Sequence, residues 1–266
     1  MSEPDQSPAR RRRSNKPNAN GEQAGGTRLT ASEIYDNVRV AAEEELDRPA
    51  LALFWSAVAA GLIIGFSFFA GAYLGTLVPP AYHTAAVAAG YPLGFIFVVL
   101  ARNQLFTENT LEPVIPLLND PSLAVLQRVM VLWGLVLVGN LLGALVFAVA
   151  AARTGIVSVE FQRALLGVAT IATEGGFWLV AYKAVYAGWL IALMAWLLGS
   201  TRATGAQVVL IWLTTAPIAA FGFKHSIAGA VEAFYRAAAG GAGYSTMIFQ
   251  FIVPAALGNV VGGVLL

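Results

Sequence analysis

Two interruptions of otherwise apolar segments contain the side chains of this sequence that could do chemistry. The first reads Leu105-Phe106-Thr107-Glu108-Asn109, and the second reads Gly222-Phe223-Lys224-His225-Ser226. An imidazole titrates near neutral pH, so His225 could donate a proton to the anion of a weak acid or hold that anion by charge. Glu108 and Lys224 add one charge of each sign. These residue types indicate binding and protonation of a small ion.

The composition places these interruptions in a membrane. Hydrophobic residues make up 58% of the chain and charged residues 12%, and the mean hydropathy is +0.68. Soluble domains are about 25% charged. Residues 49–101 and 237–266 contain no Asp, Glu, Lys or Arg, and each run exceeds the ~20 residues that a spanning helix needs. Backbone breaks inside a bilayer are tolerated only where protein or a water-filled cavity satisfies the freed groups, so the interruptions indicate a transport pathway.

The hydropathy pattern predicts an all-α integral membrane protein with six spans, of which the second and fifth are broken near the bilayer midplane. The expected spans are about 50–77, 84–118 with its break, 129–152, 176–198, 206–235 with its break, and a last one that ends the chain. A polar stretch is expected over 153–163. Because each half has an odd number of spans, the second half is inverted relative to the first. We therefore expect a 3+3 inverted repeat of about 50–152 and 164–266.

The N-terminal region divides into a tail and a helix. Residues 1–29 are polar and basic, and we expect them to be disordered. Thr30-Ala31-Ser32-Glu33 has the spacing of a capping box, which predicts an amphipathic interfacial helix over 30–48, before a transmembrane domain over 49–266. Ten Lys and Arg residues fall on the N-terminal side of the membrane and three on the other, so both termini are expected in the cytoplasm. No aromatic residues interleave the arginines, so nucleic-acid binding is not expected.

Several functions are disfavoured by residue types that are scarce. The sequence has no cysteine and two histidines, which leaves no disulfide, no thiolate and too few ligands for a dedicated metal cage. It also offers no nucleophile with an adjacent base. We therefore expect no enzymatic activity, no metal and no cofactor.

A small-residue motif follows each interruption a little over thirty residues later. It reads Gly139-Asn140-Leu141-Leu142-Gly143 in the first half and Gly258-Asn259-Val260-Val261-Gly262 in the second. Small residues let membrane helices approach closely, so the motifs predict packing between the third and sixth spans. The packing residues are Gly139, Gly143, Gly258 and Gly262. Asn140 and Asn259 are expected to have a mixed role, because amides at membrane depth need partners.

The two breaks can be aligned on their phenylalanines. Matching Phe106 with Phe223 places Thr107 opposite Lys224 and Glu108 opposite His225. Half-helices that begin at the breaks would direct their positive N-termini toward a small anion between them. The expected caps are Thr107 and Asn109 for the first half-helix and Ser226 for the second.

Glu108 and Lys224 leave two interpretations open. Either charge alone would be expensive in a bilayer, so the two could form a structural ion pair that ties the breaks together, with Arg102 as a third member. Alternatively, they form a charge gate, or Glu108 is a proton-coupled carboxylate beside His225. The recurrence of Phe106 and Phe223 in both breaks indicates hydrophobic constrictions around a midplane site, and the alternative is that these rings only pack against neighbouring helices.

These residues give the chain a resemblance to the formate/nitrite transporter family over about residues 30–266. The resemblance rests on Leu105-Phe106-Thr107, on Phe223 with His225-Ser226-Ile227, and on Asn259 within Pro254-Ala255-Ala256-Leu257-Gly258-Asn259. The Phe-Thr-Glu-Asn-Thr stretch looks more like the family's YfdC-like branch. The resemblance implies an aquaporin-like inverted repeat and a pentamer with one pore per protomer. It also implies that Leu105, Phe106 and Phe223 line constrictions, that Thr107 lies on a moving loop and that His225 is the central protonatable group.

The expected function is therefore a channel or secondary transporter for small monovalent anions or weak acids, formate-like or nitrite-like. We expect a homopentamer in a bacterial inner membrane, with the lipid bilayer and the anion as its partners. Glu108 leaves a second possibility open, in which the same fold passes a neutral solute or a cation. A third is a closed membrane regulator that recruits a partner or anionic lipid through its basic tail.

Overall fold

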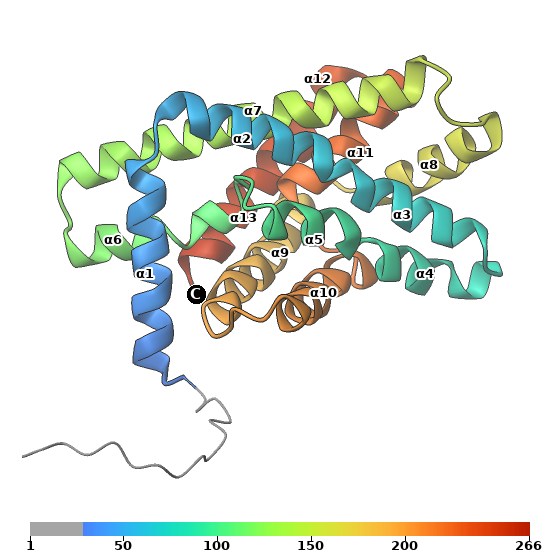
Figure 1. The fold of residues 1–266 in the computed structure, drawn as a ribbon. Helices are drawn as coiled ribbons and strands as arrows, with labels where there is room; N and C mark the ends of the chain where they lie inside the picture. Colours follow the sequence, from blue (N-terminus) through green and yellow to red (C-terminus); the bar gives the residue numbers. More distant parts are fainter. Residues whose placement is uncertain (1–28) are drawn as a thin grey trace, which may run out of the picture.

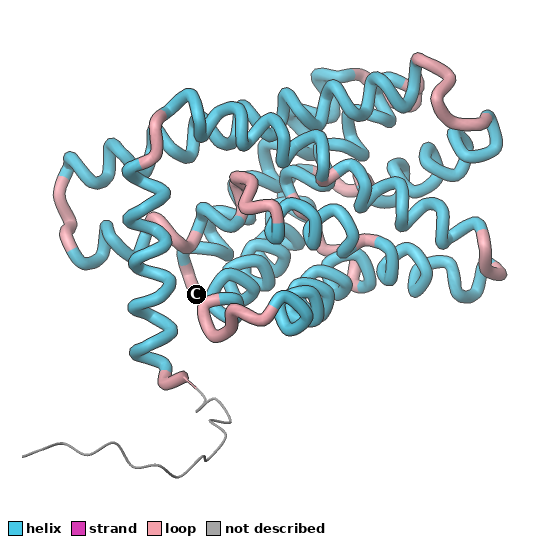
Figure 2. The backbone as a smooth tube through the Cα atoms, in the orientation of Figure 1, coloured by secondary structure: helices cyan, strands magenta, loops and turns pink. Residues whose placement is uncertain are grey.

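The computed structural model describes residues 29–266, so the basic tail expected over 1–29 lies outside it except for Leu29. Helices make up nearly all of these residues, and none of residues 29–266 is in a strand (Figure 2). Five helical stretches are long and apolar enough to cross a membrane: Ala50–Thr76, Pro80–Leu100, Leu123–Arg153, Phe177–Leu198 and Tyr244–Val264. Thr204–Ala220 is a shorter apolar helix. The expected all-α membrane architecture is confirmed.

Four of these long helical stretches pack in two pairs. α2 (Ala50–Ile63), which α3 (Gly65–Thr76) continues, lies along α7 (Leu123–Arg153) (Figure 1). α9 (Phe177–Leu198) lies along α13 (Val253–Val264) in the same way. The expectation that the third and sixth spans pack together was therefore wrong, because each packs against the first span of its own half.

The small-residue motifs explain this pairing. A Cβ atom on Gly143 of α7 would strike the backbone carbonyl of Val58 in α2, and one on Gly262 of α13 would strike that of Val185 in α9. Only a residue without a side chain allows these backbones to approach so closely. Gly139 and Gly258 make similar approaches one turn earlier, where a Cβ atom would lie 2.7 Å from Ala57 Cβ and 2.6 Å from Ala184 Cβ respectively.

The helices that precede the two breaks end in the same way. The first is built from η1 (Pro80–Tyr82), α4 (His83–Gly90) and α5 (Pro92–Leu100), and the second is α10 (Thr204–Ala220). Each is followed by a residue in the left-handed region, Arg102 with φ 54° and Gly222 with φ 65°. The next amide then bonds a carbonyl five residues back: Asn103 N–H to Val98 at 3.0 Å, and Phe223 N–H to Ile218 at 2.9 Å. Both helices therefore end in a Schellman-type cap.

The segments after the breaks differ. The first break continues into a 3₁₀ turn, η2 (Glu108–Thr110), and a short helix, α6 (Val114–Asn119). The second continues directly into α11 (Ser226–Ala238). After α11, the chain passes through α12 (Tyr244–Met247) and a π-helical turn, η3 (Ile248–Ile252), into α13. The C-terminus lies at the α1 end of the bundle (Figure 1).

One further helix lies at each end of the bundle. α1 (Ala31–Asp47) begins with the capping box of Thr30 and Glu33 and buries Val38 and Ala42. Three contacts hold α1 against the rest of the bundle. Tyr35 donates a hydrogen bond to Asn119, Asn37 donates one to the Gly199 carbonyl, and Asp47 forms an ion pair with Arg128.

At the opposite end lies α8 (Val159–Ala172), where the sequence had predicted a polar stretch over 153–163. Ser158 caps this helix through the Phe161 N–H at 3.2 Å. Leu165, Val168 and Ala169 are buried, and the helix contacts α3 and α11. The charges of Glu160 and Arg163 concealed the amphipathic pattern of this helix.

Candidate functional site: two helix breaks and a cavity

Each break is anchored by one of the two motif asparagines. The amide of Asn140 accepts a bond from Phe106 N–H at 2.8 Å and donates to the carbonyls of Gln104 and Ala57, both at 2.8 Å. Asn140 is fully buried, and these three bonds tie the first break to α2 and α7. The amide thus supplies the partners that a helix break inside a membrane protein requires.

Asn259 makes the same set of bonds to the second break. It accepts from Ser226 N–H at 2.7 Å and donates to the carbonyls of Lys224 at 3.0 Å and Ala184 at 2.8 Å. Asn259 is also fully buried. The pattern of partners is therefore duplicated between the halves: two groups in the break and one carbonyl in the first span of the same half.

These bonds correct the alignment of the two breaks. Equivalent contacts match Phe106 with Ser226 and Gln104 with Lys224, three residues away from the match of Phe106 with Phe223. The recurrence of phenylalanine misled the alignment, because Phe223 follows the left-handed residue directly whereas Phe106 lies three residues further along. Thr107 is consequently not the counterpart of Lys224.

His225 is the N-cap of α11 and contacts the first break. Its Nδ1 accepts hydrogen bonds from the backbone N–H groups of Ile227 at 3.2 Å and Ala228 at 3.1 Å, so His225 caps the helix. Its Nε2 lies 2.8 Å from Thr107 Oγ1, and the ring of Phe95 packs against it at 5.0 Å between centroids. Because Nδ1 accepts two bonds, the ring proton is on Nε2 and is donated to Thr107. His225 and Thr107 are 2% and 0% exposed.

The other expected caps differ from the structure. Ser226 does not cap α11, and its hydroxyl has no hydrogen-bond partner among the described residues. The Thr107 side chain does not cap η2. The amide of Asn109 instead donates back into the break, to Gln104 Oε1 at 2.9 Å and to the Leu105 carbonyl at 3.3 Å.

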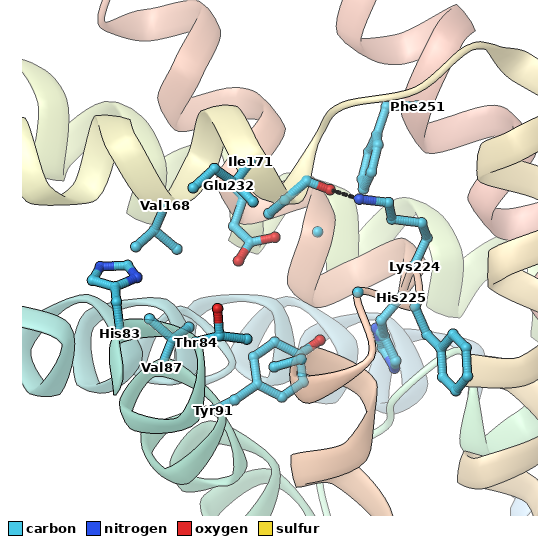
Figure 3. A pocket seen from close by; sticks show the side chains of 15 residues that line it. His83, Thr84, Val87, Tyr91, Val168, Ile171, Lys224, His225, Glu232 and Phe251 are labelled. Atoms are coloured by element: carbon cyan, nitrogen blue, oxygen red, sulfur yellow. Dashed lines mark hydrogen bonds between the residues drawn. The ribbon is translucent and has the colours of Figure 1, made fainter. Parts of the chain in front are cut away.

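A cavity of about 110 Å³ leads to His225 from the α8 side. Its lining comes from α4, α8, α11 and the second break, and includes Phe223, Lys224 and Glu232 (Figure 3). Lys224 is 5% exposed, and its ammonium donates a hydrogen bond to the Ala172 carbonyl at the end of α8. A cation is favourable there because a helix C-terminus has negative character.

Glu108 lies on the other side of the break and does not pair with Lys224. Within residues 29–266 the ion pairs are Arg39 with Asp36 and Glu43, Arg48 with Glu45, and Arg128 with Asp47. The carboxylate of Glu108 is close enough to Glu112 and Glu45 for their charges to interact, and its Oε1 is buried without a partner in the described chain. The ion-pair interpretation is therefore wrong for this structure, and Arg102, its third expected member, is exposed.

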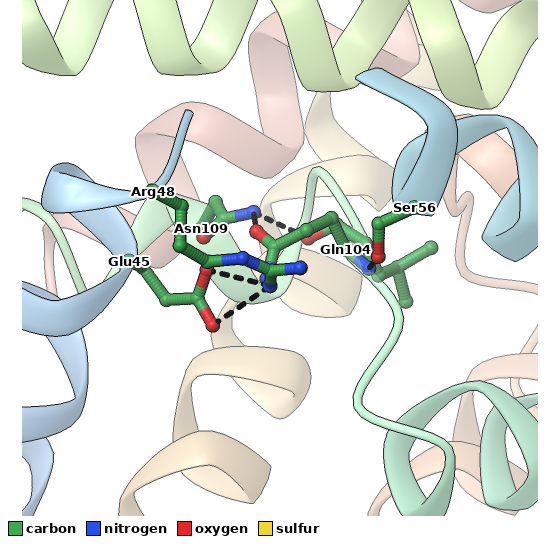
Figure 4. A network of polar contacts seen from close by, with 6 residues as sticks. Glu45, Arg48, Ser56, Gln104 and Asn109 are labelled. Carbon is green, nitrogen blue, oxygen red and sulfur yellow. Dashed lines mark hydrogen bonds and ion pairs between the residues drawn. The ribbon is translucent and has the colours of Figure 1, made fainter. Parts of the chain in front are cut away.

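Polar side chains of the first break lie near the end of α1 (Figure 4). Glu45 and Arg48 form an ion pair at 3.0 Å near the end of α1, and Gln104 N–H donates to Ser56 Oγ at 3.1 Å (Figure 4). Leu105 and Phe106 of this break are buried, at 0% and 3% exposed. Neither residue lines the cavity on the α8 side, whereas Phe223 does.

The sequence reasoning assigned no role to Glu232, which is buried and lines the cavity. A signal was available: Glu232 lies seven residues after His225, which is two helical turns, and it is the first charged residue after that break. Tyr91 and Phe95 approach the same site from the helix that precedes the first break. They had no such signal because aromatic residues are common in apolar spans.

The helices long and apolar enough to cross a membrane, and the two breaks that meet at a buried histidine, make this chain a membrane protein with a candidate transport site. The family model described as formate/nitrite transporter matches residues 32–266, and the chain belongs to this family.

Among its relatives, the chain is 36% identical to "Inner membrane protein YfdC" of Escherichia coli (strain K12), over 88% of this chain and 75% of that protein. It is 28% identical to "Probable formate transporter" of Methanothermobacter thermautotrophicus, over 76% of this chain and 85% of that protein. The expected resemblance to the family, including its YfdC-like member, is confirmed.

Two solved structures show the same fold. A "Pentameric formate channel with formate bound" matches with a TM-score of 0.63 and 20% identity, covering 80% of this chain and 92% of that one. An "FNT family ion channel" matches with a TM-score of 0.69 and 21% identity, covering 88% of this chain and 92% of that one.

Proposed function

We propose that this protein is a pentameric pore or secondary transporter for small monovalent anions or their weak acids in a bacterial inner membrane. The single observation that supports this most directly is the hydrogen bond between Thr107 and His225, which joins the two breaks at the end of the cavity. Family membership supports the transport function, and the pentameric formate channel and the inner-membrane relative support the assembly and location.

The proposal includes an inverted 3+3 arrangement with both breaks near the bilayer midplane. The duplicated Schellman-type caps, asparagine bonds and glycine contacts support it, because each recurs once per half with corresponding partners. The count of Lys and Arg residues, ten on the N-terminal side of the membrane against three on the other, supports cytoplasmic termini.

In the proposed pathway, an anion enters the cavity and is attracted by Lys224, beside the positive N-terminus of α11. The side chain of Phe223 narrows the pathway between the cavity and His225. Leu105 and Phe106 narrow the pathway after His225, on its way to the α1 side. The Nε2–H of His225, when released from Thr107, is a hydrogen-bond donor for the substrate. Asn259 holds this arrangement through the backbone of Lys224 and Ser226.

The test is flux of formate, nitrite and chloride into proteoliposomes at acidic and neutral pH. Thr107→Val removes the hydroxyl at nearly constant volume, and Thr107→Ser keeps it as the matched control. We expect Thr107→Val and His225→Asn to reduce formate or nitrite flux at least tenfold, and Thr107→Ser to stay close to wild type. Wild-type vesicles that pass none of the three ions faster than protein-free vesicles would overturn the proposal.

A second candidate is passage of a neutral solute or a cation, which the carboxylates on the α1 side favour. Glu108, Glu112 and Glu45 would repel an anion that leaves the break toward α1. Osmotic swelling with neutral solutes, measured beside ion flux, separates the candidates. Anion flux that appears only in Glu108→Gly would show that this carboxylate closes or redirects the pore.

A further inference from the structure

Glu232 is a buried carboxylate for which neither the fold nor the helix ends require a charge. It is 7% exposed, and no group within residues 29–266 donates a hydrogen bond to it. Asp and Glu are almost never so buried unless they are paired, because removing an unpaired charge from water is costly. An ionisable residue in such a place within a membrane protein is a candidate for function.

The helix places Glu232 on the face that leads to His225. Residues 225, 229 and 232 are separated by four and three positions, which puts them on one side of α11, and all three line the cavity. Seven residues correspond to about 10 Å along a helix axis. Gly229 contributes no side chain between the two groups, and Figure 3 shows the carboxylate directed into the cavity.

The groups that face this carboxylate come from several elements. His83 and Tyr91 line the cavity from α4 and its C-terminal end, and Lys224 lines it from the break, close enough for its charge to interact with that of Glu232. α8 contributes only apolar side chains there, Val168 and Ile171 among them. Of the charges further out, Arg236 of α11 donates to Thr173 Oγ1 at 3.0 Å, and Lys183 and Glu174 act on Lys224.

The hydrogen bonds of His225 limit the number of protons that its ring can give to a substrate. Its Nδ1 accepts hydrogen bonds from two backbone N–H groups at the positive end of α11. A second proton on this ring would break these bonds, and the positive charge would be repelled by the N-terminal end of the helix dipole. The one proton on Nε2 would have to be replaced after every transfer. A weak-acid anion in this cavity therefore needs another proton donor.

We infer that Glu232 is the proton-exchange group of this cavity, an inference that rests on the proposed function. The protonated carboxyl gives its O–H proton to an oxygen of the anion that Lys224 attracts, which leaves the Glu232 carboxylate and a neutral acid. The neutral acid moves past Phe223, and the carboxylate takes a proton from water on the α8 side. One proton then crosses with each anion, and the cycle is electroneutral.

The experiment uses proteoliposomes that enclose a pH-sensitive dye, with labelled formate as the probe, over a range of external pH. Glu232→Gln keeps the shape but cannot release a proton, Glu232→Asp keeps the acid, and Glu160→Gln changes an exposed carboxylate of α8 as the control. General-acid groups contribute about 10²-fold or more, so we expect Glu232→Gln to lower formate flux by about 10²-fold and to flatten its pH dependence. Glu232→Asp should regain part of both, and Glu160→Gln should change neither.

Each other outcome overturns a distinct statement. If Glu232→Gln transports formate at the wild-type rate and with the wild-type pH profile, this inference is overturned and the proposed function remains intact. A faster, electrogenic flux in Glu232→Gln also overturns it, because the carboxylate would then be a barrier to anions. Absence of wild-type flux overturns the proposed function together with the inference.

An infrared measurement covers the case in which Glu232→Gln fails to fold. In the folded wild type, the carbonyl band of a protonated carboxylic acid should weaken when formate is added. Glu232→Asp should shift this band. A wild-type protein without a formate-sensitive band would contradict the inference.

Discussion

The sharpest prediction concerns Asn140, whose side chain makes three hydrogen bonds inside the protein and donates both of its amide protons there. Replacing it by alanine leaves the Phe106 N–H and the Gln104 and Ala57 carbonyls without their partner. An unsatisfied buried group costs about 1–3 kcal/mol in a soluble protein. Hydrogen bonds between membrane helices average nearer ~0.6 kcal/mol, because the unfolded state in the membrane finds partners too. Three groups and the lost volume together give an expected loss of about 2–4 kcal/mol for Asn140→Ala.

Two variants separate the hydrogen bonds from the volume of the side chain. Asn140→Asp keeps the size and the acceptor for Phe106, but it places a carboxylate oxygen against two carbonyl oxygens. It should therefore be at least as destabilised as Asn140→Ala. Asn103→Ala is the matched control, since the Asn103 side chain lies in the same break and makes no hydrogen bond within residues 29–266.

The assay is denaturant unfolding in mixed micelles, with the free energy of unfolding compared between variants. Asn259→Ala should match Asn140→Ala, because its three bonds have the same pattern. If Asn140→Ala and Asn140→Asp both stay within about 0.5 kcal/mol of wild type, the range of ordinary surface substitutions, then the asparagines do not anchor the breaks.

The close helix packing, the His225 cap and the capping box of α1 each give a further prediction. Gly143→Val should separate α7 from α2 and lower the thermal unfolding midpoint, whereas Gly134→Ala, whose added Cβ would meet nothing within 4 Å, should not; equal midpoints would contradict the packing argument. His225→Asn should keep the cap of α11, since Asn is a good N-cap, but lose the bond to Thr107, so stability should hold while flux falls; a loss of both would indicate a structural role. The hydrogen bonds that Glu33 accepts lower the pKa of its carboxyl, so their stabilisation of α1 is present above the ordinary pKa of 4.5 and is lost as pH falls through the lowered value. NMR signals of the first turn of α1 should show this loss, and an unchanged first turn in acid would refute it.

Hydropathy and end signals predicted much of the fold because they are properties of the sequence itself. Apolar runs locate spans regardless of which helices they contact, and the spacing of Thr30 and Glu33 gives the start of α1. The breaks were located by polar residues within apolar runs, and the structure places the ends of α5 and α10 there. The asparagines were identified by their duplication, although their partners were not.

The features that sequence reasoning missed depend on three-dimensional contacts. The pairing of α7 with α2 depends on which neighbouring helix packs against Gly143. A small-residue motif indicates close helix packing but does not identify the helix that packs there. The register of the breaks depends on the backbone conformations of Arg102 and Gly222, which the recurring phenylalanines do not report. Glu232 was missed because its burial depends on residues of α4 and α8, which surround the cavity together with α11 and are distant from Glu232 in the sequence.

The two breaks share their anchors but lead into different segments, and this difference assigns them different roles under the proposed function. α11 begins directly at the second break and is capped by His225, so the imidazole is fixed to a regular helix. The first break leads through η2 to Pro113 and Pro116, which have no backbone N–H, and proline disfavours a continuous helix there. Thr107 therefore belongs to the less regular segment, and a displacement of that segment would lengthen its 2.8 Å contact with Nε2. The Nε2–H then loses its Thr107 partner and is available to the substrate, so in the proposed pathway opening the pore and presenting the donor are one step.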